Sequence, residues 1–202
     1  METNGRTKCA AADTVSGDAV GMPNVIQNRQ WYIAIVNNNT ELKSGERLQC
    51  MGYDVYVPVQ QQTVRRSTGR MKTVNRIVFS SIVFIHATER ERKEAVTAPF
   101  IHRFMTNRAN REDQFNRHPL AVVPDDQIAR LKFMLYNAEA DVEFVQRQFD
   151  IGSRVRVIRG KLLGLEGNVL ENANGEAYIL VGFDILGYAK TRINTVDLEK
   201  II

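Results

Sequence analysis

The pattern of apolar and polar positions divides the first half of the chain into strand-like and helix-like segments. The run WYIAIV at 31–36 is apolar, β-branched and aromatic, has the length of a strand, and is followed by the turn-like NNNT. A short helix is predicted at about 40–51. A second strand, with period-two alternation, is expected at 53–59, ended by Pro58, and a third at 76–87. These four segments give the order β-α-β-β.

The segments that follow extend this order. Thr88 and Glu91 have the spacing of a capping box and predict a short helix that ends before Pro99. Residues 100–105 can supply a fourth strand, and PDDQIARLKFMLYNA, from Pro124, has the acidic start and single apolar stripe of a helix. The order β-α-β-β-α-β, followed by a helix, predicts an α+β fold of the ferredoxin-like type, in which helices cover an antiparallel sheet.

The pattern changes near residue 151, where short strands alternate with glycine-containing turns. The segments SRVRVIR, GNVLEN, AYILVGF and AKTRIN supply four strands of what we expect to be a small five-stranded, SH3-like β-barrel. The acidic stretch before it reads as a linker, and the first residues, rich in Ala, Gly, Asn, Asp and Thr, read as a flexible leader. We therefore expect a leader at 1–29, a first domain at 30–138, a linker at 139–150 and a second domain at 151–202.

Composition fits a folded protein, and charge adds one feature. The 202 residues are 44% hydrophobic and 25% charged, with a net charge of +4 and a pI of about 9.2. Positive charge gathers between 62 and 76, where no acid occurs, and this stretch has the look of an arm or hairpin tip. Its basic residues are Arg65, Arg66, Arg70, Lys72 and Arg76.

Candidate chemistry is sparse. The two cysteines show neither the spacing of a disulfide framework nor that of a zinc site, and the three histidines show no i, i+4 pair. No apolar run approaches the length of a membrane span, and the N-terminus lacks the apolar core of a signal peptide. We expect a cytoplasmic protein that is not an enzyme, binds no metal or cofactor and does not enter a membrane.

The stretch GSRVRVIRGKLLGLEG at 152–167 is rich in glycine but lacks the spacing of a nucleotide-binding loop. A strand, a turn and a second strand explain it better. Val155 and Val157 would then face the core, and Arg154 and Arg156 would face out. For these arginines, a solvated strand face and a nucleic-acid or protein contact are open alternatives.

The predicted strand at 76–87 carries apolar residues on both of its faces. Simple alternation sends Phe79, Ser81, Val83 and Ile85 to one face and Ser80, Ile82 and Phe84 to the other. If helices cover only one side of the sheet, the second side is an exposed apolar patch that needs a partner. A bulge at Ser80–Ser81 that resets the register is the alternative.

Two motifs together resemble a known family. The second domain matches the KOW motif at Gly152, Val155, Val157, Gly160, Gly164, Glu166, Gly167 and Val169. The Trp31-Tyr32 strand, the Val57-Pro58 strand end, the basic hairpin and the strand from Phe79 to Ile85 resemble the NGN domain of NusG-type transcription elongation factors. The final ILGYAKTRINTVDLEKI also fits this family, so the resemblance covers about residues 30–202.

The resemblance implies a monomeric processivity factor without enzymatic activity. In the family, the NGN domain binds the clamp helices of the largest RNA polymerase subunit through an apolar patch, which matches Trp31, Tyr32, Phe79, Ile82 and Phe84. The basic hairpin then lies near upstream DNA or nascent RNA. The KOW domain binds a small-subunit ribosomal protein or the termination factor Rho through a loop that matches Ile185, Leu186 and Gly187.

One departure and one subgroup refine this expectation. The family's usual FPGYVFV is FSSIVFI at 79–85, which lacks the Pro-Gly turn and the tyrosine. PLAVVPDDQIARLKFML and GKLLGLEGNV look most like the specialised NusG paralogues that antiterminate polysaccharide-biosynthesis operons. A housekeeping NusG, and an RNA-binding or ribosome-associated KOW protein without polymerase contact, are the alternatives.

Overall fold

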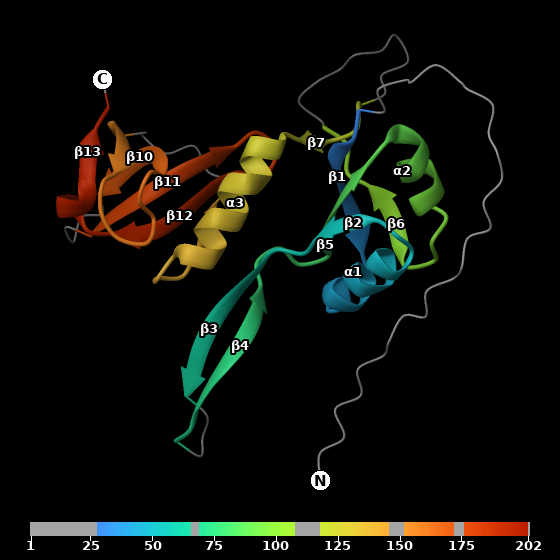
Figure 1. Ribbon diagram of the computed structural model, residues 1–202, viewed down its shortest axis with the longest axis horizontal. Helices are drawn as coiled ribbons and strands as arrows, with labels where there is room; N and C mark the ends of the chain where they lie inside the picture. The colour runs from blue at the N-terminus through green and yellow to red at the C-terminus, as the bar shows by residue number, and fades with distance from the viewer. Residues whose placement is uncertain (1–27, 66–68, 108–117, 146–151, 172–175, 202) are drawn as a thin grey trace, which may run out of the picture.

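Two antiparallel sheets lie on either side of one long helix, and a β-hairpin projects from between them (Figure 1). The computed structural model describes the chain apart from residues 1–27, 66–68, 108–117, 146–151, 172–175 and 202. Almost all of the predicted leader, and Arg66 of the basic hairpin, therefore lie outside the described residues.

The first sheet has the predicted split order. Its strands run β2-β5-β1-β6, every neighbouring pair is antiparallel, and the short β7 also pairs with β1. This arrangement confirms the β-α-β-β-α-β prediction, because β1 lies between the third and fourth strands of that pattern. The strands are β1 (Gln30–Val36), β2 (Asp54–Tyr56), β5 (Ile82–Ala87), β6 (Ile101–Phe104) and β7 (Val122–Val123).

Helices α1 (Glu41–Cys50) and α2 (Glu89–Ala95) cover one face of this sheet. Thr88 Oγ1 accepts from the Glu91 backbone N–H while the Glu91 carboxylate accepts from the Thr88 N–H, which confirms the capping box. Helix α3 (Asp125–Asn137) lies against the opposite face (Figure 1), so the sheet is covered on both sides.

Two predicted strands are each broken in two. The segment 53–59 divides at Pro58 into β2 and β3 (Val59–Arg65), and 76–87 divides into β4 (Met71–Ile77) and β5. The second break has a local cause, because Ser81 adopts a left-handed φ of 63° and its N–H donates to the buried Glu41 carboxylate at 2.6 Å. Strands β3 and β4 form the projecting hairpin, as the basic stretch predicted.

The second sheet has six strands in the order β13-β9-β10-β11-β12-β8. One of them, β8, lies within the predicted linker 139–150, so that segment is not only a connection. No pairing between β13 and β8 closes the sheet among the described residues, and the barrel stays a prediction. The strands are β8 (Glu143–Val145), β9 (Arg154–Val157), β10 (Glu166–Glu171), β11 (Ala177–Phe183), β12 (Gly187–Ile193) and β13 (Leu198–Lys200), with a 3₁₀ turn at Thr195–Asp197.

Candidate binding surfaces

The apolar residues expected on an exposed patch are for the most part covered. Phe84 is 0% exposed and Trp31 is 5% exposed, whereas Phe79 and Ile82 are partly buried. These four side chains share one face of the first sheet. Tyr32 does not join them, because it packs on the opposite face near α2, where its hydroxyl lies 3.4 Å from Glu89. The expectation of an exposed patch is therefore wrong for this arrangement of the chain.

Helix α3 and the second sheet together cover this face. Ile128, Leu131 and Met134 of α3 belong to one buried cluster with Trp31 and Phe84, and the same cluster extends to residues of the second sheet. The Trp31 ring stacks on the His86 ring at 4.8 Å, and the Lys132 ammonium lies 4.8 Å from the Trp31 ring centre. The two sheets thus share a core through α3.

A row of aromatic rings runs from one sheet to the other. The Phe79 ring lies 6.4 Å from Phe84 on the first sheet and 4.2 Å from Phe144 on β8, and Phe144 lies 6.0 Å from Phe183 on β11. Phe79 is therefore grouped with Phe84 and not with Val83, contrary to simple alternation. The left-handed residue Ser81 changes the register, as the alternative interpretation required.

The loop 185–187, predicted to bind a ribosomal protein or Rho, is held close to α3. Gln127 of α3 donates from Nε2 to Asp184 Oδ2 at 2.7 Å and accepts at Oε1 from the Asp184 N–H at 3.2 Å. Leu186 is only 7% exposed and belongs to the shared core, with Ile185 packed against it. Gly187 has a φ of 86°. We call this packing of α3 and the second sheet on the first sheet the closed arrangement. It covers part of the loop 185–187 as well as the face around Phe84.

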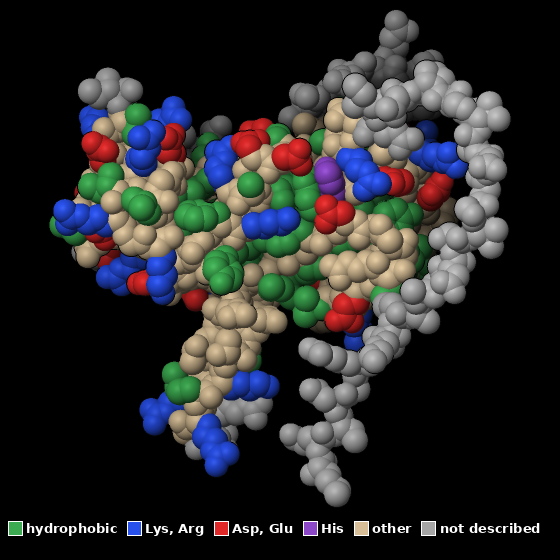
Figure 2. All heavy atoms as spheres, in the orientation of Figure 1, with side chains coloured by type: hydrophobic (Ala, Val, Ile, Leu, Met, Phe, Trp, Pro, Cys, Tyr) green, Lys and Arg blue, Asp and Glu red, His purple; other side chains and the backbone are tan. Residues whose placement is uncertain are grey.

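The basic hairpin is the most accessible of the predicted surfaces. Arg65, Arg70 and Lys72 are exposed at its far end, where Figure 2 shows blue side chains gathered around a few apolar ones. Arg76, nearer its base, lies 3.6 Å from the Asp141 carboxylate. The structure places the described basic residues along one hairpin, as expected.

The glycine-rich stretch is a strand, a turn and a strand. Val155 and Val157 are buried, while Arg154 and Arg156 face solvent and both pair with Glu166, at 3.1 and 2.5 Å. The hydrogen bond from Arg156, followed by the charges of Arg156 and Arg154, lowers the pKa of Glu166. The acid of the motif thus balances the outward arginines on the strand surface.

Two different structural requirements explain why glycine occupies these positions. Gly160 and Gly164 take φ values of 81° and 85° and have open space around them. Gly167 instead lies against a neighbouring strand, since an added Cβ would meet Leu180 O at 2.3 Å. Gly152 likewise faces Val169 O, at 2.2 Å from such a Cβ.

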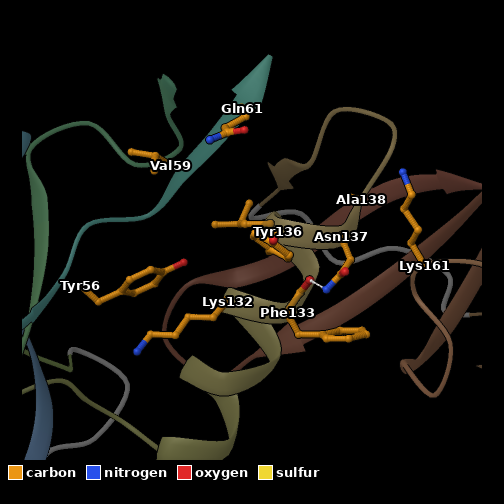
Figure 3. A pocket seen from close by; sticks show the side chains of 10 residues that line it. Tyr56, Val59, Gln61, Lys132, Phe133, Tyr136, Asn137, Ala138 and Lys161 are labelled. Carbon is orange, nitrogen blue, oxygen red and sulfur yellow. Dashed lines mark hydrogen bonds between the residues drawn. The ribbon is translucent and has the colours of Figure 1, made fainter. Parts of the chain in front are cut away.

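A groove of about 980 Å³ follows the seam between the two sheets and the hairpin (Figure 3). Tyr56, Val59 and Gln61 line one side, α3 lines the floor, and Lys161 comes from the turn between β9 and β10. Lys132 lies 4.9 Å from the Tyr56 ring centre, and burial raises the pKa of the Tyr56 hydroxyl. The lining contains no carboxylate, thiol, imidazole or aliphatic hydroxyl, and its titratable side chains are Tyr56, Tyr136, Lys132 and Lys161.

None of the described helices is long and apolar enough to span a membrane. Within the same residues, no group of three or more His, Cys, Asp or Glu side chains could hold a metal ion.

Comparison with known proteins identifies the first domain. The family model described as transcription termination factor nusG matches residues 29–132, about half of the chain. No curated protein sequence matches the chain. Thermotoga maritima NusG, in a structure reporting its domain interaction, has 16% identity and a TM-score of 0.46, over 87% of this chain and 98% of that one. The MjSpt4:Spt5 complex in conformation A has 11% identity and a TM-score of 0.27, over 85% and 97%.

Proposed function

The chain belongs to the NusG family, and from this premise we propose that it is a transcription elongation and antitermination factor that binds RNA polymerase. It has no enzymatic activity of its own and acts by keeping the polymerase processive. The observation that carries the proposal is the apolar second face of the first sheet. On this face, Phe79 and Ile82 are partly buried, and Trp31 and Phe84 are buried.

Polymerase binding requires this face to be uncovered. The second sheet contacts it through Phe144, and Gln127 of α3 holds the loop at Asp184. We propose that these contacts separate when the clamp helices of the largest polymerase subunit replace the second sheet. A surface that is apolar enough to be buried within the chain is suited to be buried against a partner.

The other surfaces take supporting roles in the proposal. The exposed arginines and lysine of the hairpin lie near upstream DNA or nascent RNA, where they bind phosphates without reading sequence. The loop 185–187 binds a small-subunit ribosomal protein or Rho once it leaves α3. The protein acts as a monomer in the cytoplasm, and its targets are long operons. The sequences of 119–135 and 160–169 favour operons for polysaccharide biosynthesis, because they look most like those of the specialised paralogues.

The test is readthrough of a terminator in the leader of the protein's own operon, with purified host polymerase. We expect the wild-type chain to bind polymerase and increase readthrough, and Phe79→Asp to lose both. Leu163→Asp is the matched control, because Leu163 is 60% exposed and lies on the second domain. Phe84 is unsuitable, because a charge at a fully buried position would unfold the domain.

The exposed cationic hairpin favours one other candidate function, an RNA-binding or ribosome-associated protein without polymerase contact. It predicts RNA affinity that survives Phe79→Asp together with no binding to polymerase in either form. Readthrough that is unchanged by wild-type protein, with no polymerase bound, would overturn the proposed function. Readthrough of every operon tested would indicate a housekeeping factor instead of an operon-specific one.

A further inference from the structure

The base of the hairpin is hydrogen-bonded to the short connection that leads from α3 to β8. The Gln60 side chain, 4% exposed, donates from Nε2 to Ala140 O at 3.0 Å and accepts at Oε1 from the Val142 N–H at 3.0 Å. Because both the nitrogen and the oxygen of this amide are hydrogen-bonded, they fix the position and the orientation of the connection. Residues 140–142 cannot move away without leaving buried polar groups unpaired.

Asp141, between these two backbone contacts, is held by two more hairpin side chains. Gln62 Nε2 donates to Asp141 Oδ1 at 2.6 Å, and Arg76 Nη1 lies 3.6 Å from Asp141 Oδ2. The Arg76 and Asp141 side chains are 49% and 58% exposed. An anion from solution can therefore reach Arg76 and compete with Asp141.

The same connection is bonded to the second sheet on its other side. Thr191 Oγ1 donates at 3.4 Å to Ala140 O, which also accepts from Gln60. Val142 is buried in the shared core, and Glu143, where the connection enters β8, pairs with Lys190 of β12 at 2.9 Å. The connection is thus fixed between the hairpin and the second sheet, and a change on one side reaches the other.

We propose that the β3–β4 hairpin is a latch that holds the second sheet over the first, and that nucleic acid on the hairpin weakens this latch by drawing Arg76 away from Asp141. Nucleic acid is the partner that the charges favour, since Arg65, Arg70 and Lys72 continue the positive charge of Arg76 to the exposed end. Its role as ligand rests on the proposed function, whereas the latch itself does not involve polymerase. The coupling is reciprocal, so a weaker latch also increases affinity for nucleic acid.

Hydrogen exchange of the Asp184 amide in the whole chain tests the latch without polymerase. This N–H donates to Gln127 Oε1 at the junction of α3 and the second sheet, away from the hairpin. Gln60→Ala should accelerate its exchange on the order of tenfold, whereas Gln61→Ala, at an exposed neighbouring position, should leave it unchanged. Protected amides in β1 and β11 show that both sheets remain folded. Unchanged Asp184 exchange in a folded Gln60→Ala chain overturns the latch.

The nucleic-acid step is tested by adding DNA of about 20 nucleotides, as single strands and as duplex. Either form should accelerate Asp184 exchange in the wild type and have much less effect in Arg76→Gln. DNA that binds, by fluorescence anisotropy, yet leaves Asp184 exchange unchanged overturns the coupling, and so does the absence of DNA binding. None of these experiments contains polymerase. Their outcomes therefore test the latch and its coupling to DNA even if the protein does not bind polymerase.

Discussion

The ring of Phe79 lies against the ring of Phe144, with the ring centres 4.2 Å apart and the planes inclined at 57°. Phe79 comes from the first domain, just before β5, and Phe144 comes from β8 of the second sheet. The contact joins the surface that the resemblance assigns to polymerase with a strand that the sequence assigned to a linker.

The two rings should be energetically coupled. Phe79→Ala and Phe144→Ala each remove the same contact, so the double variant should be less destabilised than the sum of the two. We expect a coupling free energy of about 0.5–1.5 kcal/mol in a double-mutant cycle from urea unfolding. The pair Phe79 and Tyr136 is the control, because the Tyr136 side chain is 89% exposed. Equal coupling in both pairs would show that Phe144 does not pack on Phe79 in solution.

Nucleic-acid affinity should depend on the hairpin and on salt. Arg70→Gln should weaken DNA binding about equally for different sequences and reduce the slope of log K against log salt by about 1. Arg154→Gln is the matched control, since Arg154 is exposed but pairs with Glu166. Anisotropy titrations over a salt series measure both. A loss of affinity confined to one DNA sequence would contradict phosphate binding.

The two kinds of motif glycine should respond differently to asparagine, which tolerates a left-handed backbone better than other side chains. Gly164→Asn, in open space at a φ of 85°, should cost about 1 kcal/mol or less. Gly167→Asn should cost about 1–3 kcal/mol or more, because its Cβ would meet Leu180 O. Denaturant unfolding distinguishes the two, and similar losses would refute the close approach at Gly167.

Glu166 should make stability depend on pH. Its pKa is lowered in the folded chain, so its pairing with Arg156 and Arg154 stabilises the fold above the unfolded pKa of about 4.3. This contribution is lost as pH falls through the lower, folded pKa. Glu166→Gln should therefore reduce Tm near neutral pH, and the difference should disappear in acid. Glu171→Gln on the same strand controls for the change in charge. A difference that grows in acid would reverse the sign of the shift.

Local rules were sufficient for much of the fold. A continuous apolar, β-branched and aromatic run located β1, alternation located the buried Val155 and Val157, and the capping box at Thr88 located α2. These features depend on residues near one another in sequence. The break at Ser81 was harder to predict, because it depends on a carboxylate from α1, forty residues earlier in the chain.

The covered face could not be predicted in the same way. Alternation showed that both sides of β5 are apolar but not whether solvent, a partner or the chain itself covers the second side. Gln60 and Gln127, which hold the closed arrangement, are single polar residues without any periodic signal. Phe144 did have a periodic signal, because apolar residues alternate with acids in DVEFV. This is a strand pattern, but the high charge of 139–150 concealed it.

The most direct test of the central claim compares Phe79→Asp with Phe144→Asp in binding to RNA polymerase. Both variants break the same ring contact and favour separation of the sheets, but only Phe79 lies on the face proposed to bind the clamp helices. We predict that Phe144→Asp binds polymerase more tightly than the wild type and that Phe79→Asp binds more weakly. Weaker binding by both variants, or unchanged binding by both, would contradict the proposal that the second sheet covers the polymerase-binding face.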